Sequence, residues 1–83
     1  MSEIESLKVK DINGLQVQKC LNICKTAQKF ESDIYMKHNN YKIDVKSILG
    51  LLSLACPQGE TVELEAVGHD SKEAINALKE VIC

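Results

Sequence analysis

The sequence has no apolar stretch that approaches the roughly 18 residues a membrane-spanning helix requires, so we expect no membrane insertion. Its first residues, Met1-Ser2-Glu3-Ile4-Glu5, are acidic and lack the basic and apolar regions of a signal peptide. There is no surplus of basic residues either, since the net charge is −2, and nucleic-acid binding usually needs a basic face. These absences predict a cytoplasmic protein that binds no nucleic acid.

The residues that carry common chemistry are also missing or scattered. We find no Gly-rich phosphate loop and no nucleophile beside a base, so no cofactor is expected. Cys20 and Cys24 lie four residues apart on the apolar side of a predicted helix, which favours core packing over metal binding or redox chemistry. His38 and His69 supply no second pair of zinc ligands, and both are predicted to lie on the solvated surface.

What is present is a regular alternation of apolar and polar positions. No repeat or linker divides the chain, so residues 1–83 are predicted to form one domain with a modest core. Asn39-Asn40 suits a tight hairpin, and Asp70-Ser71-Lys72-Glu73 resembles a capping box with Asp70 as the cap. The predicted elements are strands near 7–10, 34–37, 43–45 and 62–66, and helices over roughly 17–29, 47–55 and 71–82.

This order of elements, βαββαβα, predicts the fold class. Each strand is expected to have one apolar and one polar face, so the helices should cover a single face of the sheet. The prediction is an α+β protein, a two-layer open-faced sandwich with a four-stranded antiparallel sheet and three helices on one face.

The short helix that begins at Ser47 is apolar around most of its circumference. A two-layer domain buries only one side of such a helix, so Ile48, Leu49 and Leu52 are expected to stay exposed as a docking patch. Alternatively, neighbouring loops cover these side chains. Ser47 itself is either an ordinary N-cap worth about 1 kcal/mol or a phosphorylation site at the start of the helix.

The segment Lys46-Ser47-Ile48-Leu49-Gly50-Leu51-Leu52-Ser53-Leu54 resembles the regulatory-serine segment of the HPr family. Gly14-Leu15-Gln16 falls where that family has its Gly-Ile-His active-site turn, and the resemblance extends over essentially the whole chain. It implies an HPr-like fold for the domain. HPr is the phosphocarrier of the bacterial phosphoenolpyruvate:sugar phosphotransferase system.

In that family a histidine at the start of the first helix takes phosphate from phosphoenolpyruvate through Enzyme I. The positions of this histidine, of the following arginine and of the proline after it hold Gln16, Gln18 and Lys19 in this sequence. A carboxamide cannot accept a phosphoryl group as imidazole does, and Gln18 lacks the charge with which arginine grips phosphate. The phosphohistidine site of the family is therefore expected to be degenerate in this sequence, and the protein is expected not to be an enzyme. Crh-like members of the family share the glutamine and the serine but keep the arginine and the proline.

The resemblance implies a regulatory or adaptor protein that is switched by phosphorylation of Ser47. Its partners would be an HPr-type serine kinase and phosphotransferase-system or transcription-regulator proteins, and it would be a monomer or a weak homodimer. The residues expected to bind partners are Leu15, Gln16, Cys20, Ile48, Leu49 and Leu52. Two alternatives stay open: a phosphocarrier that uses His69 or Cys20 as acceptor, and a structural or oligomer-forming domain.

Overall fold

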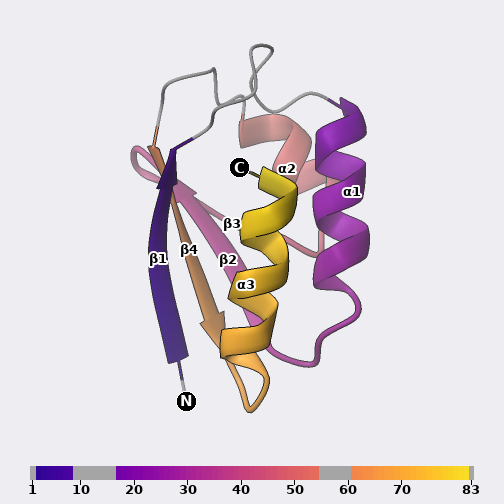
Figure 1. Ribbon diagram of the computed structural model, residues 1–83. Coiled ribbons are helices and arrows are strands. Elements are labelled where there is room, and N and C mark those ends of the chain that lie inside the picture. Colours follow the sequence, from indigo (N-terminus) through magenta and orange to yellow (C-terminus); the bar gives the residue numbers. More distant parts are fainter. Residues whose placement is uncertain (1, 9–16, 55–60, 83) are drawn as a thin grey trace.

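The computed structural model describes residues 2–8, 17–54 and 61–82, and the structural statements below refer to these residues. The elements follow the predicted order βαββαβα (Figure 1). Their bounds are β1 Ser2–Lys8, α1 Val17–Ala27, β2 Asp33–His38, β3 Tyr41–Asp44, α2 Ile48–Leu54, β4 Thr61–Val67 and α3 Ser71–Ile82.

The strands form one four-stranded sheet in the order β1-β4-β2-β3, and all neighbouring strands are antiparallel. The helices lie against one face of this sheet (Figure 1), which confirms the predicted two-layer α+β fold. In the central strand β4, Val62, Leu64 and Ala66 are fully buried toward the helices, as their alternation predicts. No helix in the described ranges is both long and apolar enough to cross a membrane.

The open face of the sheet carries charged side chains in pairs. Lys37 Nζ lies 3.7 Å from Glu63 Oε1, and Lys42 Nζ lies 3.4 Å from Glu65 Oε1. Lys42 also stands over the ring of Tyr35, with 4.5 Å between Nζ and the ring centroid. Because these groups are partly solvated, each pair adds little stability, and the face stays polar.

Strand β1 begins five residues before the predicted strand near 7–10, and this added part has no apolar inner face. Glu5 pairs with Leu64 of β4, a residue buried toward the helices, so Glu5 and Glu3 occupy the helix side of β1. Ile4 instead lies exposed on the open face. The inward charge is compensated from α3, because Lys79 Nζ donates to Glu5 Oε1 at 2.7 Å.

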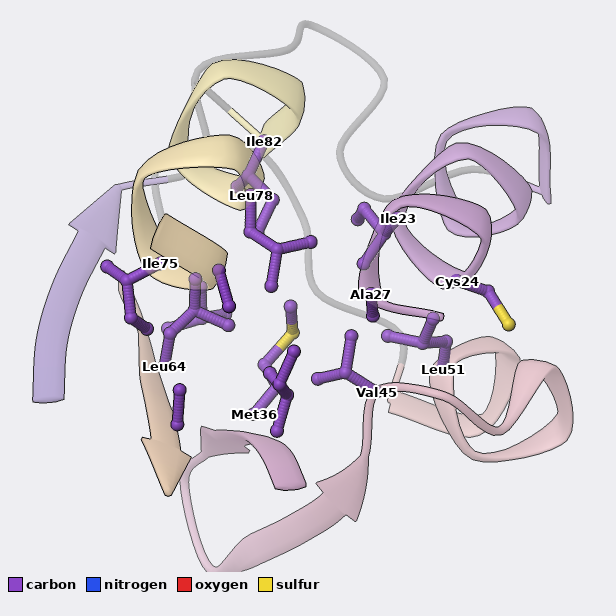
Figure 2. Packing of buried hydrophobic residues seen from close by; sticks show 14 of the residues in the cluster. Ile23, Cys24, Ala27, Met36, Val45, Leu51, Leu64, Ile75, Leu78 and Ile82 are labelled. Atoms are coloured by element: carbon purple, nitrogen blue, oxygen red, sulfur yellow. The ribbon is translucent and has the colours of Figure 1, made fainter. Parts of the chain in front are cut away.

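The core lies between the sheet and the inner sides of the helices (Figure 2). Cys20 and Cys24 belong to it, which confirms that they pack as small apolar residues. Leu51 of α2 and Leu78 of α3 are almost completely buried in the same cluster. Full burial of one such side chain stabilises the fold by about 1.5–3 kcal/mol, which matters in a domain this small.

The β2–β3 hairpin turns at Asn39 and Asn40 as predicted, and Asn39 adopts a positive φ of 57°. The prediction for the preceding residue is wrong, because His38 is buried rather than solvated. β2 continues through His38, and the alternation that buries Ile34 and Met36 places the imidazole on the same inner side. Its Nε2 atom is buried and has no hydrogen-bond partner among the described residues.

The end of α1 and the cap before α3 differ from prediction, whereas the bounds of α3 agree with it. α1 ends at Ala27, and the predicted end near residue 29 falls in the turn that follows. The carbonyl of Asp70 accepts the first hydrogen bond of α3, from the Ala74 amide at 3.0 Å. Its carboxylate, however, does not complete the predicted capping box. It bonds instead to Glu31 and Ser32, in the loop before β2.

Candidate docking and phosphorylation site

Ser47 is exposed at the start of α2 and acts as its N-cap. The Gly50 amide donates to Ser47 Oγ at 3.4 Å, and the Leu51 amide donates to the Ser47 carbonyl at 3.1 Å. A turn precedes the helix because the Ser47 amide donates to the Asp44 carbonyl at 3.0 Å. The capping role predicted for Ser47 is confirmed, and its hydroxyl lies at the surface.

The next turn of α2 exposes large apolar side chains beside Ser47. Leu49 is 78% exposed and Leu52 is 42% exposed, as predicted. The same prediction is wrong for Ile48, which is half-buried and packs against the core. Ile48 and the buried Leu51 are three residues apart and so share one side of the helix, the side that faces the domain.

Helix α1 adds two exposed apolar residues that the sequence analysis did not assign to a docking site. Val17 is 60% exposed and Leu21 is 37% exposed, one turn apart, and α1 lies beside α2 (Figure 1). The helical pattern alone does not separate Leu21 from the core, because the consecutive residues Ile23 and Cys24 of the same helix are both buried. We call Val17, Leu21, Leu49 and Leu52 together the apolar patch.

Cys20 does not belong to this surface, so its assignment as a partner-binding residue is wrong. Its side chain is completely buried in the core, on the inner side of α1. Burial raises the pKa of the Cys20 thiol, which keeps the sulfur neutral and a poor nucleophile. The structure therefore also argues against Cys20 as an alternative phosphoryl acceptor.

Gln18 and Lys19 occupy the opening turn of α1, and the side chain of each donates a hydrogen bond within the protein. Gln18 Nε2 donates to Asn22 Oδ1 at 3.3 Å, one turn further along the same helix. The Lys19 ammonium donates to the Val81 carbonyl at 2.9 Å and so reaches the last turn of α3. Leu15 and Gln16, the other two residues assigned to this region, lie outside the described residues.

His69, the other acceptor considered, is exposed as predicted. Its Nε2 lies 3.9 Å from Glu31 Oε2, a loose contact between two solvated side chains. The loop between β4 and α3 that carries His69 lies at the opposite end of the molecule from the start of α1 (Figure 1). Phosphate on His69 would therefore be far from the apolar patch.

The fold and the site define a class: small open-faced α/β sandwiches with a serine-capped helix beside an exposed apolar surface. The family described as the PTS HPr component phosphorylation site matches residues 4–83, so the chain belongs to the HPr family. It is 33% identical over 78 residues to the phosphocarrier protein HPr of Neisseria meningitidis, covering 94% of this chain and 88% of that protein.

Solved structures of the same family are similar to it over most of the chain. HPr from Thermoanaerobacter tengcongensis superimposes with a TM-score of 0.92 at 38% identity, covering 96% of this chain and 90% of the other. Crh of Bacillus subtilis, a catabolite-repression protein whose structure is described as an intertwined dimer with a swapped domain, gives a TM-score of 0.78 at 34% identity. That match covers 92% of this chain and 87% of Crh.

Proposed function

We propose that this protein is a regulatory member of the HPr family that docks protein partners through its apolar patch and is switched by phosphorylation of Ser47. The observation that carries the proposal is the position of the exposed Ser47 hydroxyl, at the N-cap of the helix that exposes Leu49 and Leu52. A charge added at Ser47 would therefore lie next to the docking surface.

The proposed switch is a phosphoryl transfer from ATP by an HPr-type serine kinase. The Ser47 Oγ–H bond is replaced by an Oγ–P bond, the γ-phosphoryl group leaves ADP, and the proton goes to the base of the kinase. The product carries a charge near −2 at the start of α2, where free backbone N–H groups favour an anion. The modification changes the surface charge beside the patch without requiring the domain to unfold.

The side chains at positions 16 and 19 support a role other than phosphate carriage. A carboxamide at residue 16 has no basic lone pair for a phosphoryl group, since the amide nitrogen shares its electrons with the carbonyl. The Lys19 ammonium already bonds to the Val81 carbonyl, and a flexible ammonium does not reproduce the paired donors of arginine. Phosphate arriving through Enzyme I would find no suitable acceptor there.

A parallel phosphorylation assay tests the proposal. The protein is incubated with an HPr-type serine kinase and ATP in one reaction, and with Enzyme I and labelled phosphoenolpyruvate in the other. Intact mass and peptide mapping should show one phosphate on Ser47 in the first reaction and none in the second. Ser47→Ala should abolish the gain, and Ser53→Ala, an exposed serine on the same helix, should leave it unchanged.

Two results would contradict the proposal. Absence of phosphate on Ser47 in the kinase reaction would remove the switch. Acid-labile label from phosphoenolpyruvate would instead identify the chain as a phosphocarrier with another acceptor, and peptide mapping would show whether that acceptor is His69.

A second candidate function is self-association, which the described dimer of the similar protein Crh favours. In this chain β1 is an edge strand with Ile4 exposed and two glutamates on its inner side. The packing of β1 against the helices therefore depends partly on ion pairing rather than on apolar contacts alone. Sedimentation velocity at micromolar concentration separates the two candidates. A stable dimer would favour an oligomer-forming domain, and a monomer would favour the regulatory adaptor.

A further inference from the structure

The peptide bond that precedes Ser47 is held on both of its polar atoms. Its N–H, which belongs to Ser47, donates to the Asp44 carbonyl at 3.0 Å. Its carbonyl, which belongs to Lys46, accepts from Cys24 Sγ at 3.2 Å and from Gln28 Nε2 at 3.4 Å. A peptide group with both ends bonded cannot rotate without breaking a hydrogen bond, so the backbone that leads into Ser47 is restrained.

The two donors, Cys24 of α1 and Gln28 of the turn that follows it, are linked to each other. Gln28 Nε2 also lies 3.3 Å from Cys24 Sγ, four residues earlier in the chain, so the thiol and the amide form a triangle with the Lys46 carbonyl. Cys24 is only 7% exposed, whereas Gln28 is exposed. Water competes less for the sheltered thiol, so Cys24 should contribute more of the restraint. Figure 2 shows the Cys24 sulfur at the edge of the core, on the side of α1 that is closest to α2.

Lys46 is fastened at two further points. Its amide donates to Asp44 Oδ1 at 2.9 Å, and its ammonium donates to the Phe30 carbonyl at 2.8 Å. Phe30 follows the end of α1, so the carbonyl and the ammonium of Lys46 both bond to the same end of that helix. The end of α1 is therefore attached to the turn that presents Ser47.

We propose that Cys24 is a positioning residue for Ser47, assisted by Gln28, and that their bonds to the Lys46 carbonyl set the reactivity of the serine. The inference rests on the proposed phosphorylation of Ser47. A hydroxyl that attacks a phosphoryl group must be held close to the line of the breaking bond, and a fixed peptide plane supplies part of that orientation in advance. The contact ties the regulatory serine to the state of a thiol on another helix.

Variants at Cys24 separate the hydrogen bond from the packing. Cys24→Ala and Cys24→Val both remove the donor, the first with a smaller and the second with a larger side chain. Cys24→Ser keeps a donor at the same place and is the rescue variant. Ile23→Val is the matched control, since Ile23 is buried on the same helix and loses one methylene without touching a polar group.

Two readouts are measured on each variant of the full chain. The first is hydrogen exchange of the Ser47 amide by NMR, normalised to the slowest core amides of β4 so that global stability is factored out. The second is kcat/KM for Ser47 with the HPr-type serine kinase and ATP. Cys24→Ala and Cys24→Val should speed exchange and lower kcat/KM, each by about twofold to threefold, the factor expected for the weak hydrogen bond of a thiol. Cys24→Ser should restore most of both, and Ile23→Val should change neither.

Unchanged exchange and unchanged kcat/KM in both Cys24→Ala and Cys24→Val would overturn the inference. An equal effect of Ile23→Val would also overturn it, because general loosening of α1 would then explain the result. If the kinase fails to modify the wild-type chain, the proposed function fails on its own, and exchange at Ser47 alone decides whether Cys24 fixes the turn.

Discussion

The carboxylate of Asp70 and residue Ser32, 38 positions earlier in the chain, are joined by two hydrogen bonds. The Ser32 amide donates to Asp70 Oδ1 at 3.0 Å, and the Ser32 hydroxyl donates to the same oxygen. The Glu31 amide adds a bond to Oδ2 at 2.9 Å. One side chain before α3 therefore fastens the loop between α1 and β2.

These bonds make the stability of the protein sensitive to acid. The Ser32 hydroxyl and the two loop amides stabilise the ionised carboxylate, which lowers the pKa of Asp70 from 3.8 to about 2. The unfolded chain takes up the proton first as the pH falls, so the stabilisation is complete above pH 3.8 and is lost as the pH falls toward 2. Asp70→Asn should lower the urea midpoint at pH 7 and flatten its dependence on pH in that window. Urea titrations between pH 2 and pH 7 check this. Equal pH profiles for the two proteins would contradict it.

Gly68 lies in the turn between β4 and α3, and this position should not tolerate any other residue. Its φ is +152°, and a Cβ atom there would lie 2.5 Å from Ser32 Oγ and 2.8 Å from Ser32 Cα. Both backbone strain and the clash oppose a side chain, so Gly68→Ala should destabilise the fold by about 2 kcal/mol. Gly50→Ala is the matched control, because its Cβ would meet ordinary contacts of 3.5 Å or longer. Thermal unfolding of the two variants tests the contrast. Similar transition temperatures for both variants would show that the loop carrying Ser32 can move to accommodate the added methyl group without loss of stability.

The parts of the fold that local pattern determines were predictable. The alternation of Val62, Leu64 and Ala66 identifies a strand with one buried face, because side chains along a strand point alternately to its two sides. Ser47 was predictable as a cap because its partner, the Gly50 amide, lies only three residues away. Such features depend on neighbours in the sequence, which a single chain displays directly.

Two of the features that were missed depend on residues far apart, and the third is local. Glu5 faces inward because Lys79, 74 positions later, supplies its counter-charge. Asp70 has the sequence context of a helix cap, but distant loop amides compete successfully for its carboxylate. The burial of His38 is the local one, since the alternation of Ile34 and Met36 extends to residue 38, where the polar side chain concealed it. Periodicity alone cannot reveal a partner that only the folded chain brings near.

Leucines of α2 should divide into one that stabilises the fold and one that serves docking. Leu51 is buried, so Leu51→Ala should cost about 3 kcal/mol in the free energy of unfolding. Leu49 is largely exposed, so Leu49→Ala should change the free energy by less than about 0.5 kcal/mol. Urea unfolding measures both. A loss of more than about 1 kcal/mol in Leu49→Ala, twice the expected bound, would mean that Leu49 is structural and not free for a partner.

Restoring the three residues of the family's active-site turn should convert the chain into a phosphate acceptor. Gln16→His supplies an imidazole, Gln18→Arg supplies paired donors for phosphate, and Lys19→Pro removes the bond to the Val81 carbonyl. Proline is tolerated there because Lys19 lies in the first turn of α1, where the lost N–H costs little. With Enzyme I and labelled phosphoenolpyruvate, the triple variant should take up acid-labile label, and Gln16→His alone should take it up more slowly. The double variant Gln18→Arg and Lys19→Pro, which lacks the histidine, should stay unlabelled, as should the wild-type chain.

Label on either of these two proteins would show that the acceptor lies elsewhere in the chain. A triple variant that folds but takes up no label would show that phosphate uptake needs more than these three side chains.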